Sequence, residues 1–460
     1  MPGIVLNTYD VNNKTWNDLT AKEQVARASY INTRWAYYDG DHHKWLASPK
    51  GAKDDNLTIN LCGRSVDKTV EFIGKPECFR ADGYDETAND ITPNQDALDM
   101  LYEQYDDVIP EIVLSGLIAG HSFIKLFYDA TGKAAMTALD PTYCVVFWDA
   151  MNTRIPLFYR LQWKQGDTNY RQDIVPNTML TTDENALVNP SLIPDYWMIY
   201  DYKEIPLAAR WQMTGEQKWE YPFAPLVEWS YKKRPHQYYG VSFLHNAIPL
   251  NDAINFVASN TARILKHHAH PKTFVFGAEI EAENAVGGIW DNLPEAARIE
   301  SLELQSDLGS SLKMLDMLRG EFFANARVMD NASVKDKLGQ LTNFGVRMLF
   351  SDMLEMTDGY REAIEHGIGE CLLRMMDING IPLDYRPDAE WENPLPENKL
   401  ELLQAAKVEK ELGTTSERSL TESIGRDPDV EAQRKADEGT QSVDATVNAL
   451  EKMGNRGLFQ

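Results

Sequence analysis

The feature that most constrains the fold is a change of pattern near Pro235. Before it, short runs of β-branched and aromatic residues alternate with Gly, Asn and Pro turns, as is typical of a meandering antiparallel sheet. After it, long stretches carry apolar residues at helical spacing, the longest from Asn343 to Met376. Its apolar stripe comprises Val346, Phe350, Met353, Tyr360, Ile364, Cys371 and Met375, and Asn379-Gly380 ends it. Both patterns in one chain predict an α+β fold.

Residues 1–235 are expected to form one α+β domain. A helix predicted from Thr20 towards Ala47 should stop at Gly40, and a second, from about Ile109 to Ala119, should stop at Gly120, because glycine readily ends helices. The strand-like segments that accompany them are Ser122–Tyr128, Ala135–Leu139, Tyr143–Trp148, Ile155–Trp163, Asp195–Tyr202 and Lys218–Tyr221.

Two predicted helices then enclose a small acidic unit. The first runs from Ser242 to about His268, with Pro249 inside it, so we expect a bend or a fresh helix start near that proline. The unit, residues 271–310, contains strand-like Thr273–Phe276 and Ile299–Leu304, and the second helix spans Ser311–Arg327. A polar segment, an extended stretch over Pro382–Pro396, a helical region from Asn398 and a polar tail after residue 440 complete the chain.

The length and the cysteines suit an intracellular globular protein. A chain of 460 residues can bury roughly three-quarters of its unfolded surface, so it needs no disulfide or metal to fold. Cys62, Cys78, Cys144 and Cys371 form no CxxC pair, which favours reduced, partly buried thiols. No stretch approaches the ~20 apolar residues of a membrane span, and no secretory signal is expected at the start, so we expect no membrane association.

The charge balance argues against a protein that grips nucleic acid. The chain carries 70 acidic and 45 basic side chains, for a formal net charge of −25. Tight binding to phosphates would call for a basic surface. A conduit through which DNA slides is compatible with acidity, because like charge reduces sticking within a screening length of about 8 Å. An acidic protein without a nucleic-acid role, such as a scaffold or capsid component, remains open.

One cluster has the residue types of a metal site. Asp39, Asp41, His42 and His43 could bind a divalent cation, so a metal-dependent hydrolase is the alternative hypothesis to a solvated turn. His267, His268 and His270 are interpreted as cations at a helix C-terminus. No GxSxG, GxxxxGK[ST] or HExxH motif is present. We therefore expect no catalytic residue, no resident metal and no cofactor.

Basic residues gather in two places. Lys232-Lys233-Arg234 accompany Arg263 and Lys266, and a second set comprises Arg319, Arg327, Lys335, Lys337 and Arg347. Solvated faces or ion pairs between subunits are the ordinary interpretation of such clusters. Weak, mobile contact with a passing phosphate backbone is the functional one.

The order of these parts resembles the portal proteins of tailed double-stranded DNA phages over nearly the whole chain. Local phrases agree with that order: Tyr37-Tyr38-Asp39-Gly40, Phe72-Ile73-Gly74-Lys75-Pro76, Gly116–Tyr128 with Asp140-Pro141 and Val145–Asp149, Pro225–Trp229, Tyr239–Leu244, Leu250–Asn255, Pro396-Glu397-Asn398 and Leu412–Glu438.

The resemblance implies a portal fold with wing, two-helix stem, small α/β clip, long wing helix and helical crown. Its implied boundaries are wing 1–238, first stem helix 239–270, clip 271–310, second stem helix 311–328, tunnel loop 329–342, long wing helix 343–380, wing strand 381–396, crown 397–439 and flexible tail 440–460. It also implies a ring of twelve subunits at one capsid vertex of the virion, assembled in the host cytoplasm, through which DNA is packaged and ejected.

The resemblance also implies partners and positions for them. The large terminase subunit would dock at the acidic clip, and adaptor or tail proteins, major capsid protein and scaffold protein would bind elsewhere on the ring. The candidates for clip docking are Glu279, Glu281, Glu283, Asp291 and Glu295. Those for the stem surface facing the channel are Arg263, Lys266, Arg319 and Arg327, and those for the tunnel loop are Val334, Lys335, Asp336, Lys337 and Leu338. Because the loop's charges alternate, we expect a steric gate rather than a clamp.

Overall fold

The computed structural model describes most of the chain, in two compact units. The first unit takes in residues 1–333 and 351–392, and the second takes in 334–350 and 393–460. The described residues are 9–11, 13–47, 54–81, 93–149, 152, 154–180, 193–205, 210–235, 237–269, 273–276, 298–301, 308–330 and 343–395, with scattered positions from 404 to 434. Among them, no helix is both long and apolar enough to cross a membrane.

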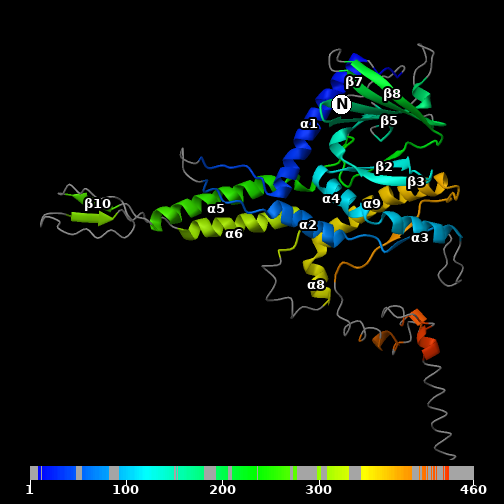
Figure 1. Ribbon diagram of the computed structural model, residues 1–460. Coiled ribbons are helices and arrows are strands. Elements are labelled where there is room, and N and C mark those ends of the chain that lie inside the picture. Colours follow the sequence, from blue (N-terminus) through cyan, green and yellow to red (C-terminus); the bar gives the residue numbers. More distant parts are fainter. Residues whose placement is uncertain are drawn as a thin grey trace, which may run out of the picture. The chain divides into compact units, whose positions relative to one another are not determined.

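A five-stranded antiparallel meander forms one layer of the first unit (Figure 1). Its strands, in spatial order, are β4 (Cys144–Trp148), β5 (Pro156–Gln165), β6 (Thr168–Pro176), β7 (Trp197–Ile205) and β8 (Arg210–Trp219). Helix α1 (Lys14–Asp39) begins beside it, capped by Asn13, whose side chain accepts a hydrogen bond from the Trp16 amide. Trp16 is buried with Phe147 and Phe158 in the core beneath the sheet. Gly40 ends α1 with φ 88°, as predicted.

A second, three-stranded sheet is ordered β3-β2-β9 and lies between helices. The strands are β2 (Ser122–Tyr128), β3 (Ala134–Leu139) and β9 (Leu226–Trp229), and the helices are α4 (Val108–Ala119) and α9 (Ser351–Ile378). Trp229 is buried between the two helices at two glycines. A Cβ added at Gly116 would lie 2.1 Å from the Trp229 ring, and one added at Gly367 would lie 2.8 Å from Trp229 Cβ. Glycine at both helix positions is what allows the indole to fit.

The remaining short elements tie distant parts of the sequence to this body. Strand β1 (Cys78–Arg80) pairs antiparallel with β12 (Asp388–Glu390), which lies within the predicted extended stretch 382–396. Helices α2 (Leu61–Ile73) and α3 (Pro93–Tyr105) pack against α9. The described residues of the first unit also contain the 3₁₀ helices η2 (Pro141–Tyr143), η3 (Asn177–Met179) and η4 (Phe243–His245).

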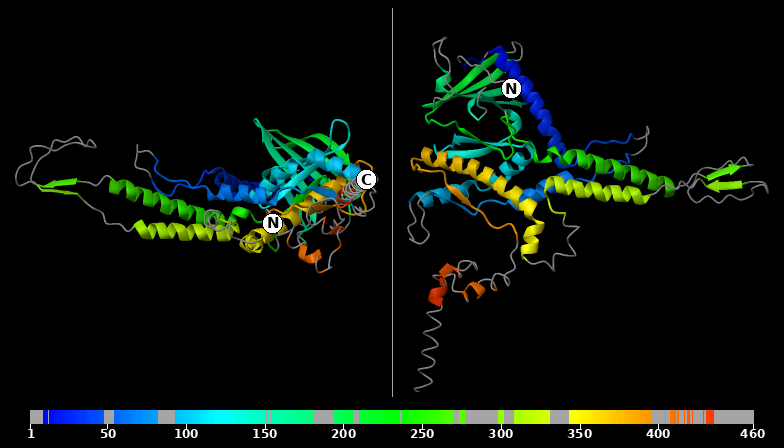
Figure 2. Two further views of the ribbon diagram at one scale, coloured as in Figure 1. Left: turned by 90° about the horizontal axis from the view of Figure 1, so that it is seen from below. Right: turned by 180° about the vertical axis from the view of Figure 1, so that it is seen from behind.

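A helical hairpin extends from this body, as Figures 1 and 2 show. It consists of α5 (Ala247–Ala269), β10 (Thr273–Phe276), β11 (Arg298–Ser301) and α6 (Leu308–Ala326). The two helices pack along their length, and Thr273 pairs with Ser301 in the antiparallel β10–β11 ladder. Pro249 is the third residue of α5, where a proline costs no intrahelical hydrogen bond, so the predicted fresh helix start is confirmed.

The predicted single helix over residues 343–380 is divided in the structure. Helix α8 (Asn343–Leu349) ends before Phe350, and α9 starts at Ser351. The break coincides with the division between the two units, since α8 belongs to the second and α9 to the first. Met353, Tyr360, Ile364, Cys371 and Met375 are buried in α9 as expected. The prediction of one continuous helix is therefore wrong, because the apolar stripe continues across Phe350 although the helix stops there.

Candidate functional site at the base of the helical hairpin

The chain enters the hairpin through a close approach of two glycines. Gly120 ends α4 with φ 88°, and a Cβ there would lie 2.6 Å from the carbonyl oxygen of Gly240. A Cβ at Gly240 would lie 2.0 Å from the carbonyl oxygen of Gly120, so neither position has room for a side chain. Ser242 follows and caps η4 by accepting a hydrogen bond from the Leu244 amide. The glycines therefore fix where the hairpin leaves the body.

Four polar side chains on one face of α5 bind an extended segment, residues 55–62, that precedes and enters α2. We call these contacts the polar seam. Asn251 Oδ1 accepts hydrogen bonds from the Leu61 and Cys62 amides at 3.0 and 3.1 Å. Asn255 Oδ1 accepts from the Ile59 amide at 2.8 Å, and Ser259 Oγ accepts from the Leu57 amide at 2.9 Å. Arg263 binds Asp55 through Nε and Nη2, at 2.7 to 3.1 Å.

The spacing of the polar seam follows from backbone geometry. Its residues on α5 are four apart, which corresponds to about 6 Å along a helix axis. Their partners are two apart in an extended chain, which corresponds to about 6.6 Å. The two repeats match closely enough for every second residue of the segment to meet every fourth residue of the helix. A run of backbone amides thereby finds partners without a neighbouring strand.

His42, one of the four residues of the predicted metal cluster, instead forms hydrogen bonds with the polar seam. Its Nδ1 accepts from Asn251 Nδ2 at 3.1 Å and from Asn255 Nδ2 at 2.8 Å, while its Nε2 lies 3.0 Å from the Tyr37 carbonyl oxygen. Both ring nitrogens are therefore engaged in protein hydrogen bonds. His43 instead packs edge-on to Trp45. No group of three or more His, Cys, Asp or Glu side chains suited to a metal occurs among the described residues, Asp39 and Asp41 included.

A basic pocket lies where α5 begins and α6 ends. It has a volume of about 420 Å³ and is lined by Lys232, Lys233, Arg234, Val241, Ser242, Phe243, His245, Asn246, Asn325, Arg327, Met356 and Tyr360. Four of these side chains are cationic: Lys232, Lys233, Arg234 and Arg327. Lys233 Nζ lies 3.5 Å from Glu228 Oε1, and burial raises the pKa of that carboxyl group. Partial burial, together with the nearby Arg327, lowers the pKa of Lys232.

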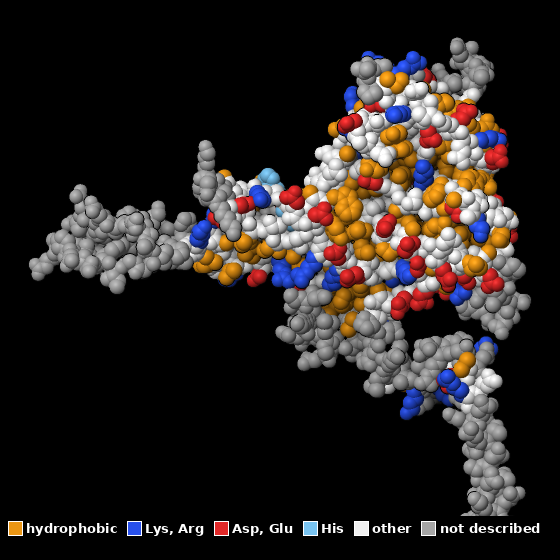
Figure 3. Space-filling view, in the orientation of Figure 1, with side chains coloured by type: hydrophobic (Ala, Val, Ile, Leu, Met, Phe, Trp, Pro, Cys, Tyr) orange, Lys and Arg blue, Asp and Glu red, His pale blue; other side chains and the backbone are white. Residues whose placement is uncertain are grey.

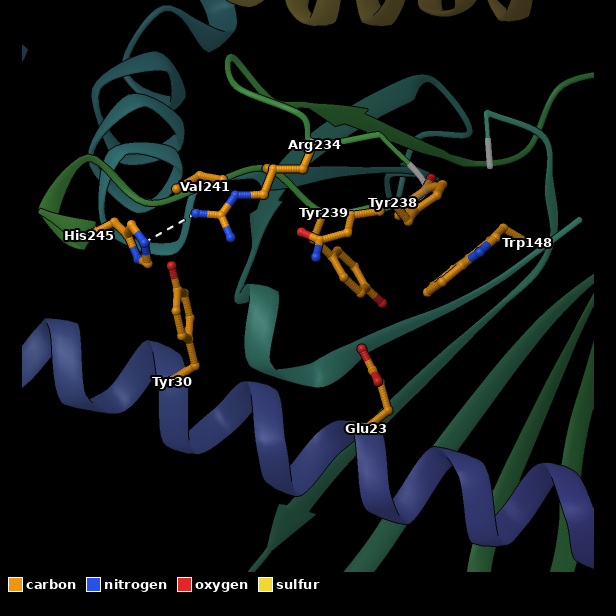
Figure 4. Close-up of a pocket in the computed structure, with 10 residues that line it drawn as sticks. Glu23, Tyr30, Trp148, Arg234, Tyr238, Tyr239, Val241 and His245 are labelled. Carbon is orange, nitrogen blue, oxygen red and sulfur yellow. Dashed lines mark hydrogen bonds between the residues drawn. The ribbon is translucent and has the colours of Figure 1, made fainter. Parts of the chain in front are cut away.

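Figure 4 shows the neighbouring cavity of about 370 Å³, which shares Arg234 and His245 with the basic pocket. Arg234 Nη2 lies 3.1 Å from His245 Nε2. Burial, with Arg234 beside the ring, lowers the pKa of His245, so the imidazole accepts this bond as a neutral group. Tyr30 and Glu23 of α1 face the same cavity (Figure 4).

Arg327 reaches the basic pocket from a conformation that favours glycine. Its φ is 52°, and among the described residues it alone combines a positive φ with a side chain. It ends α6 as a left-handed cap, donating its amide to the Ala324 carbonyl at 3.2 Å. A left-handed residue with a side chain costs roughly 1–2 kcal/mol. The backbone strain therefore coincides with a charged side chain placed in a pocket.

The four basic candidates for the channel lie in separate environments in the structure. Arg263 is paired with Asp55 in the polar seam, and Arg319 Nη2 lies 2.9 Å from Asp330 Oδ1. Lys266 is exposed near the far end of α5, and Arg327 lines the basic pocket. Lys232 to Arg234 and Arg327, noted in separate sequence clusters, therefore meet. Arg263 does not join them.

Several predicted site residues lie outside the described residues. These are the tunnel-loop candidates Val334, Lys335, Asp336, Lys337 and Leu338, and the clip candidates Glu279, Glu281, Glu283, Asp291 and Glu295. The side chains of His267, His268 and His270 lie outside them too. The partners on α5 were not predicted from the sequence, although one signal could have indicated a polar face: the four-residue spacing of Asn251, Asn255, Ser259 and Arg263.

Comparison with known proteins identifies the family. The family model described as "Phage portal protein, SPP1 Gp6-like" matches residues 20–445. No curated protein sequence matches the chain. A solved structure titled "Neck of empty GTA particle computed with C6 symmetry" contains a chain that is 12% identical, with a TM-score of 0.46, over 80% of this chain and 90% of that one.

The match extends over both units, through the sheets, the helical hairpin and the region after α9. The class it defines is a structural component of phage particles. The chain belongs to the phage portal protein family, in its SPP1 Gp6-like branch, as the resemblance in sequence indicated.

Proposed function

We propose that this chain forms a ring of twelve copies at one vertex of a phage capsid and that double-stranded DNA passes through the ring during packaging and ejection. Membership of the portal family supports this proposal. The observation that carries it is the apolar surface of the helical hairpin. Large hydrophobic side chains are exposed on the described parts of α5 and α6. They are Phe256, Leu265, Leu312, Met314 and Met317, with exposed fractions of 43%, 50%, 56%, 42% and 55%.

Such a surface on a single copy calls for a partner. Monomeric soluble proteins rarely expose extensive contiguous apolar surface, and permanent assemblies commonly bury 2,000 Å² or more at each interface. Neighbouring copies of the hairpin would cover these side chains and line a tube. Figure 3 shows apolar side chains along the hairpin.

The parts of the chain take the following roles in this proposal. The body formed by residues 1–238 is the wing, α5 and α6 are the stem, and residues 271–310 between them are the clip. Residues 329–342 form the tunnel loop, α9 is the long wing helix, and β12 belongs to the wing strand segment 381–396. Residues 397–439 form the crown, and residues 440–460 are the tail that follows it.

The stem would offer DNA little electrostatic grip. Among the four channel-facing candidates, Arg263 and Arg319 are matched by Asp55 and Asp330. Lys266 is exposed and would make weak contacts with phosphates, which suits a conduit through which DNA must slide. Retention of DNA would then depend on the tunnel loop as a steric gate.

The ring would also be a docking platform in the virion. The large terminase subunit would bind the acidic clip, through Glu279, Glu281, Glu283, Asp291 and Glu295, during assembly in the host cytoplasm. Adaptor and tail proteins, scaffold and major capsid protein would contact other faces of the ring. Opposite charge across such an interface favours rapid and specific encounter with a basic partner.

Native mass spectrometry and negative-stain imaging of the purified chain test the proposal. The expected result is a ring with a central hole and a mass of about twelve copies. A stable monomer at micromolar concentration would overturn it. An assembly without a central hole would favour a scaffold or capsid role instead.

A further inference from the structure

Helix α9 carries an acidic stripe on its exposed side. The stripe consists of Asp352, Glu355, Asp358 and Glu362, all of which are exposed. None forms an ion pair within the described part of the chain, although Asp358 interacts electrostatically with the nearby guanidinium group of Arg361. Arg361 itself donates to the carbonyl oxygens of Ile73 and Glu392. The stripe is thus a set of carboxylates facing solvent.

Glu355 and Glu362 of the acidic stripe lie on a different face of α9 from Met356 and Tyr360, the residues of this helix that line the basic pocket. At about 100° per residue, the stripe occupies an arc of about 120° on the α9 surface. Met356 and Tyr360, on the buried face, project about 100° to 160° around the helix from Glu355 and Glu362. The basic pocket and the acidic stripe therefore adjoin different faces of α9.

The cations of the pocket outnumber their ion-pair partners in the part of the chain that the structure describes. Of Lys232, Lys233, Arg234 and Arg327, only Lys233 forms an ion pair within the described residues, with Glu228. Lys232 Nζ lies 5.4 Å from the Tyr231 ring centroid, a contact that orients the ammonium group without neutralising it. The strained conformation of Arg327 adds a further cation where the backbone alone would favour glycine.

We infer that the basic pocket of one subunit receives the acidic stripe on α9 of the next subunit in the ring, with Lys232 and Arg327 facing Glu355 and Glu362. This inference rests on the proposed ring and names the surfaces that would set its order. A closed ring of identical subunits needs two different, mutually complementary patches on each copy. The basic pocket and the acidic stripe are two such patches, and α9 connects them because it contributes Met356 and Tyr360 to the pocket and carries the stripe.

A second copy of this chain fits the pocket better than a passing phosphate backbone does. The opposing charges belong to the same chain, in similar number, and every copy carries both. Such pairing also gives specificity, because contact between like charges is unfavourable and disfavours head-to-head association of pocket with pocket.

Charge reversal and its rescue test the pairing. The pocket variant is Lys232→Glu with Arg327→Glu, the stripe variant is Glu355→Lys with Glu362→Lys, and the fourth protein combines all four changes. Native mass spectrometry would give the concentration at which half the chains are in rings. Each double variant should raise it tenfold or more, since a factor of ten corresponds to about 1.4 kcal/mol. The fourfold variant should return it to within about threefold of the original value.

Controls separate this inference from the ring proposal and from misfolding. Lys164→Glu with Arg210→Glu reverses two exposed cations on the five-stranded sheet and should leave assembly unchanged. Circular dichroism should show the helical content of the unaltered chain in every variant. If the unaltered chain forms no ring, the proposed function itself fails. If it forms rings that both double variants also form at the same concentration, or if the fourfold variant assembles no better than the double variants, the pairing is overturned while the ring stands.

Discussion

Arg263 and Asp55 form a two-point ion pair, with Arg263 Nη2 at 2.7 Å from Asp55 Oδ1 and Arg263 Nε at 3.1 Å from both carboxylate oxygens. Arg263 also donates to the Ala47 carbonyl at 3.0 Å. The pair is the last contact of the polar seam, six residues before the end of α5. Its effect is to fasten a helix that projects from the body to a segment that continues into α2.

The polar seam should contribute measurably to stability. Changing Asn255 to Ala would leave the Ile59 amide without its acceptor and remove a donor to His42. Loss of a buried partner costs about 1–3 kcal/mol, so we expect a lower thermal unfolding midpoint by differential scanning fluorimetry. Asn260→Ala, a change at a half-buried position on the same helix outside the polar seam, is the matched control. Equal midpoints for the two variants would show that the polar seam adds no stability.

The glycine contact at the entry to the hairpin should tolerate no side chain. Gly240→Ala would place a methyl group 2.0 Å from the Gly120 carbonyl oxygen, where backbone has to move. Strain of this kind typically destabilises a protein by about 1–3 kcal/mol or more. Gly320→Ala, in open space on α6, should instead stabilise the helix by up to about 1 kcal/mol. Chemical denaturation followed by tryptophan fluorescence would compare them, and a harmless Gly240→Ala would contradict the packing described here.

Stability should fall on acidification because His121 is held neutral. His121 is fully buried, and Arg27 Nη2 lies 2.7 Å from its Nε2. Burial, followed by the charges of Arg27 and Lys233, keeps the pKa of His121 well below 6.5. The unfolded chain takes up a proton near pH 6.5 while the folded chain does not, so the stabilisation present above that pH is lost below it.

The contribution of His121 can be isolated with His121→Gln, whose amide oxygen can still accept from Arg27. The difference in unfolding free energy between the two proteins should change by at most about 1.4 kcal/mol per pH unit below pH 6.5. Unfolding midpoints measured from pH 8 to pH 5 would show the variant's curve to be flatter. Parallel curves would mean that His121 does not remain neutral in the folded protein.

Deletion of Val334–Leu338 tests the proposed gate. These residues precede α8, outside the two stem helices, so ring assembly should be retained. Packaging or retention of DNA should fall, measured as the length of protected DNA per particle and as infectivity. A deletion of equal length within the tail, residues 445–449, serves as the control. Unchanged packaged length and infectivity in the loop variant would remove the gate hypothesis.

Much of the local structure could be predicted, because the signals are local. The predicted strands Ser122–Tyr128 and Thr273–Phe276 coincide with β2 and β10, and Gly40 and Gly120 end their helices. Turn chemistry explains part of this agreement: Asp129 Oδ1 accepts from the Thr131 and Lys133 amides, and Gly132 has φ 81°. By contrast, β6 and α3 were missed, since neither shows a clear alternation or helical stripe.

The site itself could not be predicted, because its contacts join residues far apart in the chain. Asn251 meets Leu61 across 190 positions, and no periodicity reveals such a partner. The φ of Arg327 is likewise set by the end of α6 and the neighbouring helices rather than by its own preference. The break at Phe350 could not be predicted from the local pattern either, because the apolar stripe continues across it. The overall class was accessible through family resemblance, which depends on the order of many weak phrases.

The polar seam has a mechanical consequence for the hairpin. Its four contacts are strung out along the α5 axis, so a pull that slides the helix along that axis loads all of them in parallel. A pull that lifts residues 55–62 away from α5 at one end, which we call peeling, loads the four contacts one after another. The hairpin should therefore be stiff against thrust along its length and compliant against peeling, with the Arg263 ion pair at the end where peeling would start.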